Sequence, residues 1–457
     1  MRRSILFFSV ALFTLTSCSS QYPYRAGNAA TETFMADPKT CPELTTASRY
    51  TIPVAYLEID DQGYFQDRGQ IDRALAILGG PGKPKYVVVF VHGWFHNASR
   101  DDENVQRFKC ALNNIQGIDD NAGEEVVGIY IGWRGESWTL PGIRYATFWD
   151  RKNTSDEAGR GSLVEFLTRL EREVKPSPNS PNKLMLIGHS FGASVVFNAI
   201  GQVLMVRFLL DVEKLASKRE APAHSQSRPG LVSGYGDLVV LVNPAIEAIR
   251  IMPFFSALNE YTAKQADLLS PAQPARLVLL SSEGDWATRI TFPAARVFST
   301  LLDQFDNDKP LTMPYEKPIT LSQRYLARQT MANVPEIQTH RPLHESTRTW
   351  DGKCPPVDAN WLPTAIEERK RQQRDSHQPE TGAGWSKVFD GTTITLTHES
   401  RTTPSNPLWI MAVGTELIPS HTGIANPVLI CLFNQLLGDP KIVNQRGRSH
   451  ERDLRSK

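Results

Sequence analysis

One serine in this chain stands between two glycines in a pattern that suits nucleophilic chemistry. Residues 188–192 read GHSFG, directly after the apolar run 184–187 and directly before an apolar, helix-like run that begins at Ala193. On a sharp strand-to-helix turn a serine hydroxyl is exposed, and flanking glycines remove the Cβ atoms that would clash. The helix N-terminus favours the negative charge that develops as a hydroxyl attacks a carbonyl. Ser190 is therefore the predicted nucleophile of an acyl-transfer reaction.

The segments that must position Ser190 alternate between strand-like and helix-like patterns. Several of the strand-like runs are apolar at consecutive positions, which is typical of a strand buried on both faces of a parallel sheet. Strands are predicted at residues 55–59, 86–91, 126–131, 183–187, 238–242, 275–280 and 408–413. Helices are predicted at residues 104–113, 162–174, 193–215 and 427–437. This alternation predicts an α/β fold.

With these motifs in this order, the chain resembles the α/β-hydrolase superfamily over residues 85–290 and 405–437. The resemblance implies the α/β-hydrolase fold, a mostly parallel central sheet flanked by helices, with a long insertion before the last strand. It implies an esterase or lipase-like serine hydrolase that acts on a small ester or acyl substrate through an acyl-enzyme and needs no cofactor or metal. The alternative is a non-catalytic, surface-anchored binding protein on the same fold, because fold does not determine function.

In this superfamily the acid and then the histidine follow the serine along the chain. His421 lies between the strand 408–413 and the last helix, where the family places its general base. Asp285, in the loop after the strand 275–280, matches the position of the acid, and Glu283 in the same loop is the alternative. Asn243 carries no charge and Glu247 lies a helical turn further on, so both fit the acid position less well.

The resemblance also implies two backbone donors for the oxyanion. They are the N–H groups of Trp94, in the loop after the strand 86–91, and of Phe191, the residue after the nucleophile. Phe95 is the alternative to Trp94. His92 precedes the serine and is therefore expected to pack within the loop. Trp94, Phe95 and residues 254–255 suggest an apolar acyl pocket.

The first residues form a targeting signal that resembles a bacterial lipobox. Arg2 and Arg3 precede an apolar run at residues 5–16, and residues 15–18 read LTSC. This resemblance implies removal of residues 1–17 and lipidation of Cys18, with the protein anchored to a membrane surface of the cell envelope. Ser19 after the cysteine favours the outer membrane. No later run is expected to cross a membrane.

The remaining organisation follows from composition. Residues 18–48 are expected to be a polar tether, residues 49–440 the hydrolase domain and residues 441–457 a polar tail. The proline-rich insertion at about 290–405 is either a lid or a surface excursion. The polar stretch 149–152 is expected to be a solvated loop.

The net charge bears on the kind of partner. Lys and Arg total 50 against 49 Asp and Glu, so the net charge of +1 argues against nucleic acid as a partner.

The cysteines bear on disulfides and metal binding. An export compartment permits disulfides, and Cys41, Cys110 and Cys354 are expected to supply one pair. Cys431 lies in an apolar run and is expected to be a small buried hydrophobic residue. The spacings do not fit a zinc site, and the oligomeric state is left open.

Overall fold

The computed structural model describes most of the chain between Tyr22 and Leu437. The described residues are 22–37, 39, 41, 49–80, 82–118, 121–137, 147–177, 179–220, 229–264, 268–305, 309–311, 319–346, 350, 352–358, 360–375, 384–399, 402–423 and 425–437. The predicted signal peptide, Cys18 and the predicted tail at 441–457 lie outside these residues.

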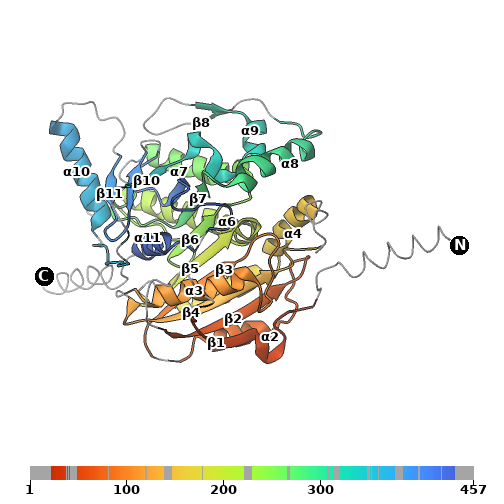
Figure 1. Ribbon diagram of the computed structural model, residues 1–457. Coiled ribbons are helices and arrows are strands. Elements are labelled where there is room, and N and C mark those ends of the chain that lie inside the picture. The colour runs from red at the N-terminus through yellow and green to blue at the C-terminus, as the bar shows by residue number, and fades with distance from the viewer. Residues whose placement is uncertain are drawn as a thin grey trace.

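An eight-stranded sheet forms the centre of the molecule, and seven of its strands are parallel (Figure 1). Its strand order is β1-β2-β4-β3-β5-β6-β7-β13, and only β1 is antiparallel to its neighbour. All seven predicted strands lie in this sheet. The strands are β1 (Thr31–Met35), β2 (Thr51–Ile59), β3 (Lys85–Val91), β4 (Glu125–Trp133), β5 (Lys183–His189), β6 (Leu238–Val242), β7 (Leu277–Ser282) and β13 (Leu408–Val413).

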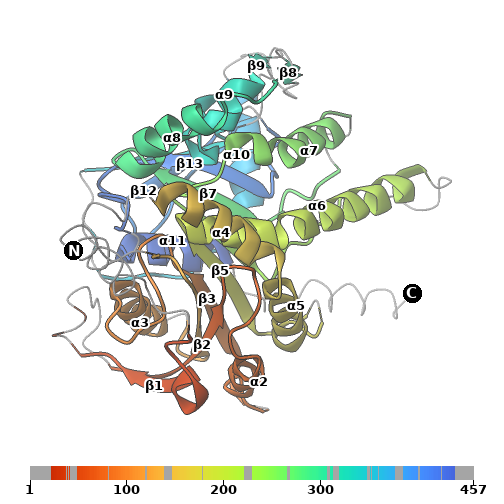
Figure 2. The ribbon, with the colours of Figure 1, turned by 90° about the vertical axis from the view of Figure 1, so that its right-hand side faces the viewer.

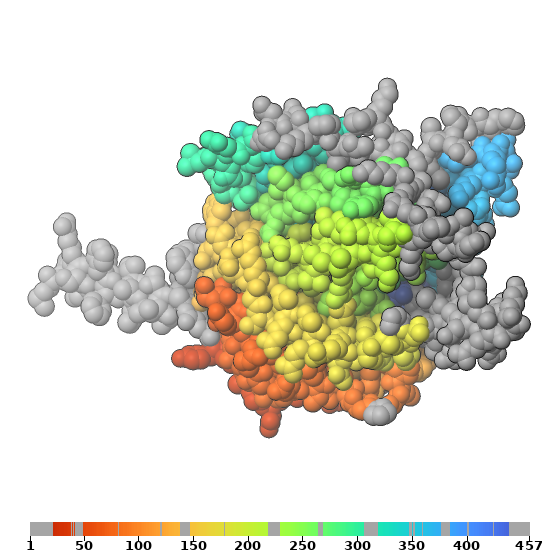
Figure 3. Space-filling model, turned by 180° about the vertical axis from the view of Figure 1, so that it is seen from behind, coloured from red at the N-terminus to blue at the C-terminus, as the bar shows by residue number. Residues whose placement is uncertain are grey.

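Helices cover both faces of the sheet. Alternate residues of each strand point to opposite faces, so the sheet separates two cores. Along β3, Val87 and Val89 join one core, whereas Tyr86 and Val88 join the other. The first core is closed by α2 (Gly69–Ala76), α4 (Phe148–Arg160), α5 (Leu163–Val174), α6 (Phe191–Glu220) and α7 (Met252–Lys264). Figure 3 shows α5, α6 and α7 covering that face. The second core is closed by α3 (Glu103–Gln116), α10 (Trp361–Asp375) and α11 (Pro427–Leu437). The α/β class with a mostly parallel sheet is thus confirmed.

The insertion between β7 and β13 carries its own elements, coloured green to blue in Figure 1. It contains two small antiparallel sheets, ordered β10-β12-β11 and β8-β9. Its elements are η5 (Ala287–Thr291), α8 (Phe292–Ser299), β8 (Lys309–Leu311), β9 (Ile319–Leu321), α9 (Gln323–Arg328), η6 (Met331–Asn333), η7 (Pro335–Ile337), β10 (His340–His344), α10, β11 (Ser386–Val388) and β12 (Ile394–His398). Two further short helices are η1 (Gly27–Ala30) and η4 (Ala248–Arg250).

Part of the expected 18–48 tether is folded instead. After η1, β1 pairs with β2 from Thr31 opposite Ala55 to Met35 opposite Thr51. A disulfide then joins Cys41 to Cys110 on α3. The polar composition of this stretch hid the strand, since an edge strand exposes one face and needs few apolar residues.

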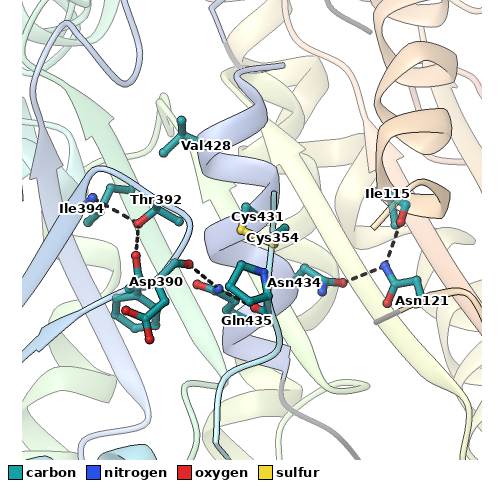
Figure 4. Close-up of a disulfide and its surroundings, with 12 residues drawn as sticks. Ile115, Asn121, Cys354, Asp390, Thr392, Ile394, Val428, Cys431, Asn434 and Gln435 are labelled. Carbon is teal, nitrogen blue, oxygen red and sulfur yellow. Dashed lines mark hydrogen bonds between the residues drawn. A yellow bond between two sulfur atoms is a disulfide. The ribbon is translucent and has the colours of Figure 1, made fainter. Parts of the chain in front are cut away.

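A second disulfide corrects the interpretation of Cys431. Cys431 on α11 is buried, as expected, but it is bonded to Cys354 in the insertion rather than being a free hydrophobic residue. Figure 4 shows this bond beside Asn434 and Gln435. Gln435 Nε2 donates to the carbonyl of Asp390 at 2.9 Å, so hydrogen bonds also connect α11 to the insertion. The apolar neighbours of Cys431 gave no sign of a partner 77 positions away.

Two other points of the sequence analysis need correction. By length and composition alone, Phe191–Ser217 is long and apolar enough to cross a membrane, although no such run was expected after the signal peptide. Its first turns are packed in the core, with Val195 and Val196 fully buried. The polar stretch 149–152 is not a solvated loop but the start of α4. There Arg151 is buried and pairs with Asp61 at 3.1 Å, and Lys152 is buried and pairs with Asp156 at 2.7 Å.

Candidate active site

Ser190 occupies a strained turn between β5 and α6. Its φ of 56° lies in the left-handed region, which non-glycine residues seldom adopt. The turn is held on both sides, because the Ser190 N–H donates to the Val242 carbonyl at 3.0 Å and the Ser190 carbonyl accepts from the Ala245 N–H at 3.2 Å. Strained backbone of this kind persists only where its surroundings impose it, and it is concentrated at functional sites.

Glycines around this turn are required by close backbone approach. A Cβ on Gly192 would lie 2.2 Å from the Val91 carbonyl oxygen, and one on Gly188 would lie 2.7 Å from Ala193 Cα. A Cβ on Gly93 would lie 2.9 Å from the Cβ of Ser190. Gly192 is therefore required by the close approach of the end of β3, and Gly188 by the close approach of the first turn of α6.

The structure brings Ser190, His421 and Asp285 together from three separate loops. His421 Nε2 lies 2.8 Å from Ser190 Oγ, and His421 Nδ1 lies 2.9 Å from Asp285 Oδ2. Because β5, β7 and β13 are parallel, their carboxyl ends meet at one edge of the sheet. The two hydrogen bonds form the series in which an imidazole takes a hydroxyl proton while a carboxylate orients it.

Asp285 is a fully buried carboxylate with a complete set of donors. Thr288 Oγ1 donates to its Oδ2 at 2.6 Å, and the Ala287 N–H donates to its Oδ1 at 2.9 Å. Burial alone would raise the pKa of Asp285, but hydrogen bonds from His421 and Thr288 outweigh it and hold the pKa below its usual value. Asp285 is therefore charged at neutral pH.

The alternative acids do not contact His421. Glu283 is exposed, and its N–H donates to the Val413 carbonyl at 2.8 Å. Glu247 is buried and lies 3.6 Å from Lys152 Nζ. The geometry therefore favours Asp285 as the partner of the imidazole.

Two residues that the sequence analysis did not assign to the site hold the His421 backbone. His189 Nε2 donates to the His421 carbonyl at 2.7 Å, and Asn243 Nδ2 donates to the same oxygen at 3.0 Å. Asn243 also has a positive φ of 47° and accepts the Ser282 N–H at 2.8 Å. The sequence did contain a signal for both residues, since His189 is adjacent to Ser190 and Asn243 directly follows the central strand β6.

His189 and three other buried histidines make stability depend on pH. Burial lowers the pKa of His92 to about 4 and those of His189 and His398 to about 3, and it lowers the pKa of His340 well below its usual value. Between pH 6.5 and 5 these histidines become protonated in the unfolded chain but stay neutral in the folded chain. We therefore expect the free energy of unfolding to decrease as the pH is lowered, by up to about 1.4 kcal/mol per pH unit for each histidine.

Chemical denaturation at pH 7, 6 and 5 measures this effect. Glu58 has the opposite effect on the free energy of unfolding, because burial raises the pKa of its carboxyl. The combined effect of four histidines is expected to exceed that of one carboxyl group. Asp285 contributes only at lower pH, since its pKa is lowered. Constant stability from pH 7 to 5 would show that these histidines are protonated in the fold.

Trp94 and Phe191, the residues predicted to donate to an oxyanion, line the same cavity as Ser190. Phe191 is the first residue of α6, where N–H groups have no partner within the helix. The alternative donor Phe95 donates its N–H to the Gly135 carbonyl at 3.1 Å. His92 is fully buried, with its Nε2 accepting the Trp133 N–H at 3.0 Å, as expected for a residue that packs within the loop.

A cavity of about 390 Å³ opens onto Ser190 and His421. Its wall is mostly aromatic and apolar, lined among others by Trp94, Phe148, Phe191, Ala245, Trp286 and Phe292. Phe255, which the sequence suggested for such a pocket, lies in the core instead and does not line this cavity. Across the part of the chain that the structure describes, no three His, Cys, Asp or Glu side chains are grouped to hold a metal ion.

No protein-family profile, curated protein or solved structure matches this chain. Its function must therefore be argued from the site itself.

Proposed function

We propose that this chain is a serine hydrolase of the α/β-hydrolase type that cleaves carboxylic esters through an acyl-enzyme. One observation carries the proposal: Ser190, His421 and a buried, charged Asp285 are hydrogen-bonded in series at the mouth of an apolar cavity. Packing alone does not favour this combination, because burying a carboxylate costs free energy unless it is hydrogen-bonded or paired.

In the first half-reaction Ser190 Oγ attacks the ester carbonyl carbon while His421 Nε2 takes the hydroxyl proton. The carbonyl oxygen becomes an oxyanion, which the N–H groups of Trp94 and Phe191 would receive. Asp285 stabilises the imidazolium and keeps the proton on Nδ1. When the C–O bond breaks, His421 returns its proton to the departing alkoxide, leaving an acyl group on Ser190.

The second half-reaction repeats these steps with water. His421 removes a proton from water, the resulting hydroxide attacks the acyl carbon, and the bond to Ser190 Oγ breaks. Ser190 recovers its proton from His421, and the carboxylic acid leaves. No group outside the chain is needed for the proton transfers.

The aromatic cavity suits the acyl part of the ester. Burying one methylene is worth about 0.8 kcal/mol, or about fourfold in kcat/KM. With p-nitrophenyl esters, we expect kcat/KM to rise by about this factor per methylene from acetate upward until the cavity is filled. Initial rates on a panel of chain lengths measure the trend. The absence of turnover on every ester would refute the proposed activity, and a maximum at acetate would refute the assignment of the cavity to the acyl group.

We also propose that Cys18 carries a lipid anchor that holds the enzyme on the cell envelope. The support is the sequence LTSC at residues 15–18 after an apolar run. Replacing Cys18 with serine should stop lipidation and cleavage, which mass spectrometry of the purified chain detects. An unchanged mass after this replacement, apart from the substitution itself, would refute the anchor.

A further inference from the structure

A row of exposed apolar side chains runs along the segment from Trp286 to Leu302, which includes η5 and α8. Four of its members expose most of their surface: Trp286 by 73%, Phe298 by 68%, Leu301 by 64% and Leu302 by 97%. The full apolar row is Trp286, Ile290, Val297, Phe298, Leu301 and Leu302. Ile290 lies on η5 and Val297 and Phe298 lie on α8, whereas Trp286 precedes η5 and Leu301 and Leu302 follow the end of α8 at Ser299. Exposed apolar surface of this extent on one segment marks an interaction site.

The apolar row is continuous with the cavity of the candidate active site. Trp286 belongs to the row and also lines the cavity, and Thr291 and Phe292 line it from the same segment. Figure 2 faces the side of the molecule on which α8 and α4 lie. A surface that covers the row would therefore lie beside the mouth of the cavity.

The charge of this segment limits the kind of partner. Residues 286–302 contain two arginines and no acidic residue. Arg289 is exposed, whereas Arg296 is half-buried and lies 3.3 Å from Glu247. The exposed Asp303 follows the row directly, so the row carries little net charge. An exposed apolar surface with little charge, beside the mouth of an apolar cavity, fits a lipid surface.

The first residues that the structure describes lie at the same edge of the sheet as the row. The Arg25 N–H donates to Glu58 at 2.7 Å and Arg25 Nε donates to the Ala98 carbonyl at 2.8 Å. Glu58 is next to the last residue of β2, so Arg25 sits at the carboxyl edge of the parallel strands, where β7 leads into Trp286. Cys18 is seven residues before Arg25 and can be at most about 25 Å away. A lipid on Cys18 would thus hold this edge close to the membrane.

We infer that the apolar row docks on the surface of a phospholipid bilayer, with the mouth of the cavity beside the lipid. In this arrangement the row inserts roughly 5–10 Å, to the boundary between headgroups and acyl chains. The orientation rests partly on the proposed anchor at Cys18 but does not depend on hydrolysis. It gives the aromatic cavity access to acyl groups that enter from the bilayer.

Quenching of tryptophan fluorescence by brominated lipid tests the docking. The full-length, lipidated chain is reconstituted in vesicles of phosphatidylglycerol and brominated phosphatidylcholine. We expect quenching that depends on Trp286, so that Trp286→Phe removes it. Leu301→Ser with Leu302→Ser should reduce the quenching of Trp286. The matched pair Val206→Ser with Leu210→Ser removes exposed apolar residues from α6 and should leave it unchanged.

The outcomes separate docking from the other proposals. Ser190→Ala should be quenched like the unmodified chain, so a failure of catalysis does not affect this readout. Sedimentation with the vesicles reports the anchor independently. Chain that sediments with vesicles but shows no quenching dependent on Trp286 would overturn the inference. So would a dimer in detergent-free solution that Leu301→Ser with Leu302→Ser separates, because the row would then bind a second copy.

Discussion

Ser190→Ala is expected to lower kcat for ester hydrolysis by roughly 10⁵-fold to 10⁶-fold, the loss typical of removing the nucleophile from such a triad. The substitution removes the one atom that forms the acyl-enzyme and leaves His421 and Asp285 hydrogen-bonded to each other. His421→Ala should cost about as much, and the double variant little more, since the residues act as a unit. Steady-state rates on the best ester of the panel measure these losses.

The control for Ser190→Ala must keep the loop and the fold. Ser420 is exposed and adjacent in sequence to His421, so Ser420→Ala should retain most of the activity. Because Ser190 has a positive φ, alanine retains the backbone strain without adding a new contact. Circular dichroism and thermal unfolding should therefore show a folded Ser190→Ala chain. Activity within tenfold of the unmodified chain would contradict the assignment of the nucleophile.

Asp285→Asn is expected to lower kcat by about 10⁴-fold. An asparagine amide at this position would donate to His421 Nδ1, which places the imidazole proton on Nε2. In that tautomer Nε2 faces Ser190 Oγ as a donor and cannot accept its proton. The backbone N–H groups of Ala287 and Thr288, which now donate to Oδ1, favour this orientation because they would bind the amide oxygen. The Thr288 hydroxyl, which now donates to Oδ2, would instead accept from the amide nitrogen.

Glu283→Gln is the matched control, since it makes the same chemical change two positions away in the same loop. Glu283 is exposed and makes no contact with His421 in the structure, so we expect kcat within about twofold of the unmodified chain. Comparing Asp285→Asn with Glu283→Gln decides which of the two acids orients His421, a choice that the sequence left open. A larger loss for Glu283→Gln than for Asp285→Asn would reverse the assignment.

The sequence was most informative where one residue type serves both packing and chemistry. Runs such as residues 87–91 are typical of strands buried on both faces, and their alternation with helix-like segments predicted the parallel sheet. The glycines at 188 and 192 revealed the turn because their neighbours tolerate no Cβ. His421 and Asp285 were predicted from the chain order of the superfamily that the sequence resembles, and in the structure the carboxyl ends of parallel strands bring them to one edge.

The sequence was least informative where a residue depends on a distant partner. Arg151 is buried only because Asp61 lies opposite, and a charged stretch alone looks solvated. Cys354 and Cys431 meet through the fold of the insertion. The exposed apolar row between Trp286 and Leu302 could not be recognised from the sequence, because apolar side chains are usually buried and only the structure shows that these are exposed.

Labelling with a fluorophosphonate probe tests the central claim most directly, because the probe reacts only with an activated serine. The account predicts labelling of the full-length chain at Ser190, its loss in Ser190→Ala and His421→Ala, and its retention in Ser420→Ala and Glu283→Gln. A folded chain that takes up no probe, or that is labelled equally well without Ser190, would contradict the account and favour a protein that binds without turnover.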